Sequence, residues 1–159
     1  MQPWTFAGPP CKGPCEGQIT LTIATGTQSD LNHHAWDFVR ALRAAQQPEG
    51  SASRYAIEPV TPPPGYTQAW HKRDLHPSDM SPLPIESLVY LRAASDGTPQ
   101  EFVECATVMP PSTAEPACEV STTLDGTPAV HLSLRYRTRQ WPDHEAIRTA
   151  VTRLVRTWL

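Results

Sequence analysis

The tetrapeptide Asp-Gly-Thr-Pro occurs twice, at 96–99 and 125–128, and it constrains how the C-terminal half of the chain folds. Asp-Gly between segments of alternating apolar residues is a strong hairpin signal, because glycine accepts the positive φ of a tight turn. The segments on both sides of each copy alternate in this way. The two turns therefore predict a four-stranded antiparallel meander.

Register selects the length of these turns. A two-residue loop at the second copy would place the apolar residues of its strands on different faces, whereas a three-residue loop with a left-handed glycine and a bulge pairs Val120 with Leu132. The same loop at the first copy pairs Leu91 with Val103. The predicted core face carries Val89, Leu91, Val103, Cys105, Cys118, Val120, Val130, Leu132, Leu134 and Tyr136. The predicted polar face carries Arg92, Glu104, Glu119, His131, Ser133, Arg135 and Arg137.

Two amphipathic helices are expected to cover the core face. The first runs from about Ser29 or Asp30 to Gln47, where apolar residues recur at helical spacing, and the second runs from Pro142 to Leu159. Strands are predicted at 18–24 and 55–60. The fold class is therefore α+β, an antiparallel sheet made of the meander and the N-terminal strands, with two helices packed on one face. Residues 1–17 form a proline-rich arm, and 18–159 form a single domain.

The four cysteines favour disulfides and export. Cys105 and Cys118 lie near each other across a predicted hairpin, at the spacing that a bridge needs. Cys11 and Cys15 enclose three residues and are expected to close a small ring. Two disulfides indicate an oxidising compartment, so we expect a periplasmic protein whose leader, with any lipid anchor, is absent from this sequence. Reduced thiols, and a metal site completed by His33 and His34, are the alternatives.

Composition and motifs argue against several functions. A net charge of −3 gives no basic footprint for nucleic acid, and no apolar run is long enough to span a bilayer. No motif for a serine nucleophile, a phosphate-binding loop or a zinc-binding histidine pair occurs. His33, His34 and His144 are therefore interpreted as solvated helix residues. We expect no enzyme activity, no cofactor and no metal.

The segment 61–84 is unusual because it places aromatic and charged residues between two proline clusters. Long loops within compact domains are often functional, and Trp, Tyr and Arg are frequent binding hot spots. The sequence therefore predicts a partner-binding loop. Its expected contact residues are Tyr66, Trp70, His71, Lys72, Arg73, Asp74 and His76. The alternative is that Tyr66 and Trp70 fold back onto the edge of the sheet.

A cysteine-containing hairpin is followed by a strand HLSLRYRTRQW and a helix PDHEAIRTAVTRLVRTWL. Over residues 86–159 this pattern resembles small bacterial envelope proteins, including immunity proteins against toxins of type VI or related secretion systems. The resemblance implies a periplasmic protein of bacterial competition that binds a cognate toxin enzyme and blocks it without catalysis. The alternatives are a secretion adaptor or chaperone that holds a partner's hydrophobic segment, another periplasmic enzyme inhibitor, and a hydrolase or metal-binding protein.

Overall fold

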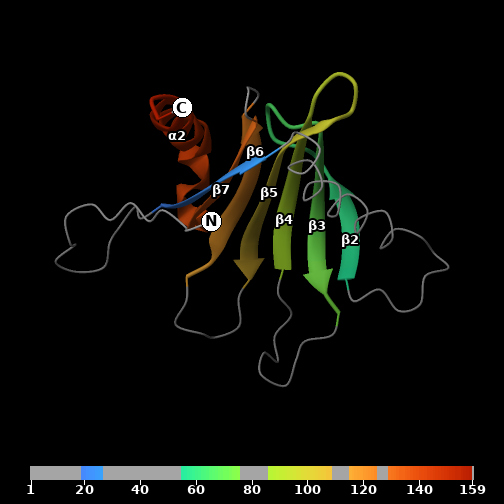
Figure 1. Ribbon diagram of the computed structural model, residues 1–159. Coiled ribbons are helices and arrows are strands. Elements are labelled where there is room, and N and C mark those ends of the chain that lie inside the picture. The colour runs from blue at the N-terminus through green and yellow to red at the C-terminus, as the bar shows by residue number, and fades with distance from the viewer. Residues whose placement is uncertain (1–18, 27–54, 76–85, 109–114, 125–128, 159) are drawn as a thin grey trace.

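The computed structural model describes residues 19–26, 55–75, 86–108, 115–124 and 129–158, and these form an antiparallel sheet with a C-terminal helical segment (Figure 1). The sheet has seven strands in the order β1-β7-β6-β5-β4-β3-β2. Consecutive strands from β2 to β7 are neighbours, and β1 adds beside β7. The strands are β1 (Thr20–Gly26), β2 (Tyr55–Val60), β3 (Gln68–Asp74), β4 (Glu86–Ala93), β5 (Pro99–Val108), β6 (Ala117–Leu124) and β7 (Ala129–Arg137).

The C-terminal segment begins as a 3-10 helix, η1 (Thr138–Asp143), and continues as α2 (His144–Arg156). The predicted helix from Pro142 is therefore confirmed, but its start is not, because Pro142 lies inside η1. Glu145 in the first turn of α2, with Arg153 and Arg156 in the last, complements the helix dipole. This is the only α-helix within the described residues. The predicted helix at 29–47 lies outside them, as do Cys11 and Cys15.

The side of the sheet that α2 covers, here called the helix side, holds the main core. Val155 of α2 is buried there, and Ile147 and Val151 pack against the same cluster. Alternate residues of the strands supply the rest, as the period of two requires. The buried members from the sheet and the adjoining loop are Leu21, Tyr66, Ala69, Tyr90, Val103, Cys105, Cys118, Val120, Val130, Leu132, Leu134 and Tyr136. Eight of the ten residues predicted for the core face are therefore confirmed on one side.

The other two predicted core residues, Val89 and Leu91, are misplaced because the register between β4 and β5 differs from the predicted one. The turn after β4 uses three residues, closed by Gly97 N to Ala94 O (2.9 Å) and Ala94 N to Thr98 O (2.8 Å), with Gly97 at φ +84°. It thus begins one residue earlier than predicted, and a further register shift follows between Arg92 and Ala93. Leu91 consequently pairs with Phe102 instead of Val103.

A shift of one residue exchanges the two faces of a strand. Val89 and Leu91 therefore lie on the opposite side of the sheet, here called the far side, where they pack with Trp70. Arg92, predicted on the polar face, lies on the helix side beside Glu101. The predicted β6–β7 register is also wrong, because Val120 pairs with Leu134 instead of Leu132. This error of two residues leaves the faces of the strands unchanged.

The segment 61–84 is a strand in part rather than one long loop. Gln68–Asp74 forms β3, which pairs with β2 on one side and with β4 on the other. Pro63, near the start of the segment, accepts a turn hydrogen bond from Tyr66 N (3.1 Å). The proline clusters therefore delimit a strand rather than a structureless stretch.

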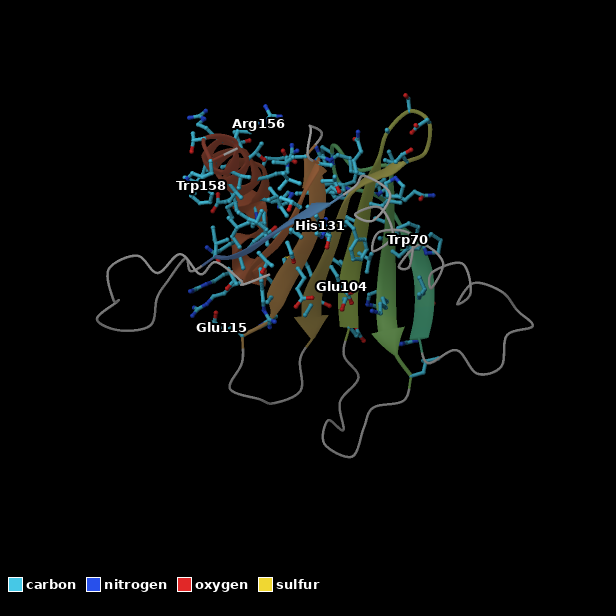
Figure 2. All side chains as sticks on the ribbon, in the orientation of Figure 1. Trp70, Glu104, Glu115, His131, Arg156 and Trp158 are labelled. Carbon is cyan, nitrogen blue, oxygen red and sulfur yellow. A yellow bond between two sulfur atoms is a disulfide. The ribbon has the colours of Figure 1, made fainter. Side chains whose placement is uncertain are left out.

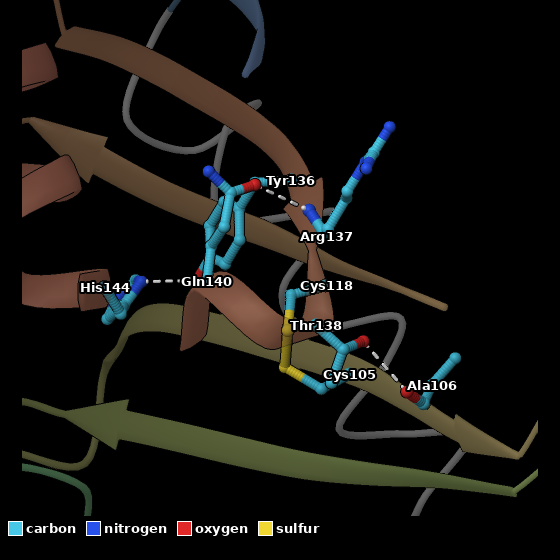
Figure 3. Close-up of a disulfide and its surroundings, with 8 residues drawn as sticks. All are labelled: Cys105, Ala106, Cys118, Tyr136, Arg137, Thr138, Gln140 and His144. Atoms are coloured by element: carbon cyan, nitrogen blue, oxygen red, sulfur yellow. Dashed lines mark hydrogen bonds between the residues drawn. A yellow bond between two sulfur atoms is a disulfide. The ribbon is translucent and has the colours of Figure 1, made fainter. Parts of the chain in front are cut away.

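The predicted disulfide between Cys105 and Cys118 is confirmed. The two residues are directly opposed in the β5–β6 register, and their Cα atoms are 3.9 Å apart. Both are buried in the helix-side core. Close by, the Thr138 hydroxyl donates to the Ala106 carbonyl (2.9 Å), so η1 is fastened to the strand that carries Cys105 (Figure 3).

Candidate functional site

The structure separates the residues predicted to bind a partner. Tyr66 is buried on the helix side, and Trp70 is buried on the far side in contact with Val89 and Leu91. The alternative interpretation, in which both aromatics fold back onto the edge of the sheet, does not describe Trp70, because this residue belongs to β3, between β2 and β4. Both are part of the framework of this region.

The charged residues of β3 are more accessible. His71 Nε2 lies 3.0 Å from a carboxylate oxygen of Glu86, and Lys72 Nζ donates to Glu104 at 2.9 Å. Arg73 is exposed. Asp74 ends the strand, and His76 lies outside the described residues.

Strand register brings these residues beside β2. His71 pairs with Glu58, so both side chains lie on the helix side, and Arg73 shares their face two residues further on. Val60 (37% exposed) and Leu75 (47% exposed) are large apolar residues of the same region that remain open to solvent. We call Glu58, Val60, His71, Arg73 and Leu75 the β2–β3 surface. Figure 1 shows α2 at the β7 end of the sheet, away from β2 and β3.

The far side of β5, β6 and β7 presents a second polar surface. Glu119 and Arg135 pair directly across β6 and β7, with Arg135 Nη1 donating to Glu119 at 3.2 Å. Both side chains are more than 60% exposed, at 65% and 63%. Glu104 and His131, labelled in Figure 2, lie on the same side. This matches the predicted polar face, apart from Arg92.

A buried group of polar side chains lies beneath α2. The carboxylate of Glu101 accepts hydrogen bonds from the Tyr66 hydroxyl (2.6 Å) and from His144 Nε2 (3.1 Å). Because a carboxylate only accepts, Nε2 carries the proton, and Nδ1 forms a hydrogen bond with the Tyr136 hydroxyl (2.6 Å). Figure 3 shows this last contact. We call these four residues the Glu101 cluster.

Two arginines adjoin the Glu101 cluster. Arg92 Nη2 lies 3.6 Å from Glu101 Oε1, and Arg148 Nε lies 3.7 Å from Glu101 Oε2. Each arginine also donates to Glu145 at 2.6 Å. Together with Glu101, these charged residues connect β4, β5 and α2. Arg92 additionally stacks over the Tyr66 ring, 4.9 Å from its centroid.

This environment shifts three acid groups. Burial alone would raise the pKa of Glu101, but hydrogen bonds from His144 and Tyr66, together with the nearby positive charges, hold the pKa below its ordinary value. Burial raises the pKa of Tyr66 far above its ordinary value, and the charge of Glu101 raises it further. Burial and the charges of Glu101 and Glu145 likewise raise the pKa of Tyr136. The cluster therefore holds an ionised carboxylate between two neutral phenols.

The Glu101 cluster serves as an anchor for α2. Glu101 and His144 are 2% and 3% exposed, and Glu101 Oε1 and both ring nitrogens of His144 are engaged with one another or with tyrosine. Glu101 Oε2 is buried without a hydrogen bond and lies 3.7 Å from Arg148 Nε. Trp141 stacks against both Tyr90 and His144 at 4.8 Å between ring centroids, which closes the cluster from η1. A reactant would have to displace this packing to reach the His144 ring.

Sequence reasoning missed this cluster. The interpretation of His144 as a solvated residue is wrong, because the imidazole is held in the core between Tyr136 and Glu101. Strand alternation offered a signal, since Glu101 lies two residues before Val103 and four before Cys105. A period of two places all three on one face.

Neither a metal-binding group nor a membrane-spanning helix occurs among the described residues. Within the described ranges, no group of three or more His, Cys, Asp or Glu is arranged to hold a metal ion. The helical segments of these ranges are too short or too polar to cross a membrane. The predicted metal alternative at Cys11, Cys15, His33 and His34 lies outside them. No protein-family model, curated protein or solved structure matches this chain.

Proposed function

We propose that this chain is an inhibitory binding protein, an immunity protein that occludes a cognate secreted antibacterial toxin through the β2–β3 surface. The observation that carries the proposal is the composition of this surface. Exposed Val60 and Leu75 lie among the polar residues Glu58, His71 and Arg73, on β2 and β3 or directly after β3, at the end of the sheet away from the helix. Apolar contacts within a polar rim are typical of protein interfaces.

The framework behind the surface supports this role. Tyr66, one of the predicted contact residues, is held by Glu101 and by the Arg92 guanidinium, so it fixes the chain just before β3. Trp70 is buried on the far side of the same strand. A preorganised surface loses less conformational entropy on binding than a flexible loop does. His71 and Arg73 remain the proposed contact residues, with Asp74 and His76 beside them in sequence. Lys72 lies on the far side of β3, where it donates to Glu104, and is not part of the proposed surface.

The proposal includes a location and a partner. The disulfide is compatible with an oxidising compartment such as the periplasm. The partner would be a toxin enzyme encoded beside this chain, bound without covalent chemistry, cofactor or metal. In this proposal the predicted helix at 29–47 completes an α+β domain, and the chain itself has no enzyme activity.

Co-expression with the adjacent toxin tests the proposal. The chain should restore growth of cells that produce the toxin in the periplasm, and the two purified proteins should form a stable complex. Arg73→Glu should weaken the complex at least tenfold, which corresponds to about 1.4 kcal/mol. Arg135→Glu is the matched control, because it makes the same charge reversal at an exposed strand position on the other surface.

The growth assay and the binding assay can each contradict the proposal. If the adjacent protein forms no complex with the chain, the immunity function is wrong. If Arg135→Glu weakens the complex and Arg73→Glu does not, binding occurs through the polar far side instead.

A secretion adaptor is a second candidate, favoured by the exposure of Val60 and Leu75. Such a protein would bind an extended or helical apolar segment of its partner. Titration with amphipathic peptides separates the two functions. An adaptor should bind several peptides of this type, whereas an immunity protein should bind only its folded toxin.

A further inference from the structure

We infer that two copies of this chain pair through the outer edge of β1, with the two β1 strands antiparallel and related by a two-fold axis at Ile23. The two seven-stranded sheets then form one continuous sheet. The inference goes beyond the proposed function, because the β2–β3 surface lies at the opposite end of each sheet and remains open to another partner.

The first observation is the place of β1 in the sheet. In the strand order, β1 lies at one edge and β2 at the other. Among the described residues, β7 is the only strand that pairs with β1. An edge strand presents backbone N–H and C=O groups that can template pairing with a strand of another chain. The residues of each edge then decide whether such pairing is favoured or blocked.

The two edges differ in this respect. β2 carries two features that oppose pairing, since Glu58 places a charge on its edge and Pro59 lacks a backbone N–H. β1 has the sequence TLTIATG, which contains no charged residue and no proline. Threonine and isoleucine predominate in it, and such β-branched residues favour strand pairing. β1 is therefore the edge that can accept a further strand.

The hydrogen bonds between β6 and β7 fix the orientation of the sheet. An L-residue that faces the viewer on an upward strand directs its N–H and C=O groups to its right. Thr138 N donates to Pro116 O (2.9 Å). Cys118 pairs with Tyr136 two residues further along the same ladder, so helix-side Cys118 also directs its groups toward β7. Viewed from the helix side with β6 upward, β7 therefore lies to the right of β6, and β1 lies to the right of β7.

This orientation shows which residues of β1 direct their backbone groups outward. β1 runs in the same direction as β6, because both strands are antiparallel to β7. The helix-side residues of β1 therefore direct their N–H and C=O groups to the right, away from β7. They are the residues that pair with buried positions of β7, namely Leu21, Ile23 and Thr25.

The same rule accounts for the proline of β2. Pro59 pairs with far-side Trp70, so its backbone groups face the outer edge of β2. Its missing N–H therefore removes no hydrogen bond of the β2–β3 ladder. The position of this proline agrees with the orientation derived from β6 and β7.

A two-fold axis at Ile23 uses every outward group of β1. Ile23 then opposes its counterpart in the second copy, and Leu21 of each copy opposes Thr25 of the other. All three residues direct their backbone toward the new neighbour, so each of these pairs is a hydrogen-bonded pair of the antiparallel ladder. Their N–H and C=O groups are then all satisfied.

The side chains of β1 favour a second copy as the occupant of this edge. On the helix side, Ile23 packs at the border of the core, and its counterpart would extend that core across the interface. On the far side, exposed Thr22 would oppose Ala24, and neither is charged. The pairing thus brings no like charges together, as a self-complementary two-fold interface requires.

Sedimentation velocity of the full chain tests the inference, and the parent chain should sediment as a dimer. Thr25→Pro removes an outward N–H from each copy and leaves the β1–β7 ladder intact. It should raise the dissociation constant of the dimer at least tenfold, which corresponds to about 1.4 kcal/mol. Thr25→Ala is the matched control, because it changes the same exposed residue but keeps the N–H, and it should retain the dimer.

Cysteine cross-linking tests the position of the axis. Directly opposed strand residues lie close enough to form a disulfide. Ile23→Cys should therefore give a covalent dimer on a denaturing gel without reductant, because this position opposes itself. Thr25→Cys opposes Leu21 of the second copy and should stay monomeric on the same gel.

Three results would overturn the inference. A parent chain that sediments as a monomer at the highest concentration measured would show that β1 does not pair with a second copy. Equal dissociation constants for Thr25→Pro and Thr25→Ala would place the interface of the dimer elsewhere. A cross-link at Thr25→Cys instead of Ile23→Cys would exclude the two-fold axis at Ile23.

Discussion

The β5–β7 part of the sheet and the β2–β3 part differ in what covers their helix-side faces. Beneath α2, a carboxylate, an imidazole and two phenols are buried together, and the Cys105–Cys118 disulfide lies in the same core. On β2 and β3, the charged side chains pair at the surface and Val60 is open to solvent. Under the proposed function, stability and recognition are separated along one sheet. Variants can therefore perturb one without the other.

The largest effect should come from Glu101→Gln. Removing this charge leaves Arg92 and Arg148 only the more exposed Glu145 as a counterion, and the cost of breaking a fully buried ion pair, about 3–5 kcal/mol, is the upper bound of the loss. Urea denaturation monitored by circular dichroism measures the loss in the free energy of unfolding. Glu119→Gln, which removes an exposed partner of Arg135, should cost less than about 1 kcal/mol. Equal losses would mean that the Glu101 cluster is not the anchor of the helix side.

Loss of the disulfide should rank next. The bridge joins residues separated by 13 positions, and closing a loop of this size restricts the unfolded chain by about 3 kcal/mol. The Cys105→Ala, Cys118→Ala double variant should unfold at a correspondingly lower urea concentration. Intact-mass measurement with and without reductant verifies the bridge in the parent protein. If the double variant is as stable as the parent protein, packing alone stabilises the β5–β7 part of the sheet.

Acid should destabilise the protein through Glu101. Because the folded pKa of this group lies below its ordinary value of 4.5, its contribution is present above that value and is lost as the pH falls through the folded pKa. One group changes stability by at most about 1.4 kcal/mol per pH unit. Melting temperatures between pH 2 and pH 7 should fall less steeply for Glu101→Gln than for the parent chain. Glu145, whose pKa is also lowered, should leave a residual slope.

The tyrosines should set the alkaline limit. Their folded pKa values lie above the ordinary value of 10.0, so their contribution is present below that value and is lost as the pH rises through the folded pKa values. Tyr136→Phe should therefore melt with a weaker dependence on pH above 10 than the parent chain does. An unchanged alkaline slope would indicate that Tyr136 ionises without opening the core.

The smallest effect on stability should come from the β2–β3 surface. Arg73→Ala changes an exposed strand residue, and such substitutions usually alter the free energy of unfolding by less than about 0.5 kcal/mol. The same urea titration measures it, with Arg135→Ala as the control on the far side. A loss above 1 kcal/mol would show that this surface is structural and not free for recognition.

The sequence predicted the meander because its evidence is local. Each Asp-Gly turn lies within a few residues of the strands it joins, and the opposed cysteines follow from the hairpin between them. The register of the strands was harder to predict from the sequence. The shift between Arg92 and Ala93 is a backbone irregularity that the residue pattern does not mark, yet it moves Val89 and Leu91 to the other face.

The buried cluster could be predicted only in part. Alternation places Glu101 on the core face, but an isolated glutamate there is costly, and its partners lie 35 and 43 residues away in the sequence. Tyr66 and His144 contact Glu101 only through the tertiary arrangement of β3, β4 and α2. The β2–β3 surface was similarly hidden, because the proline-rich flanks of β3 favour a loop.

The pairing of β1 with β7 bears on how the protein is made. The first strand of the described residues, β1, has its neighbour in the sheet more than 100 residues later in the chain, since Thr20 pairs with Arg135 and Gly26 with Ala129. β1 thus cannot join the sheet until β7 has been synthesised, and such distant pairing slows folding. The seven-stranded sheet therefore stays incomplete until β7 has been made.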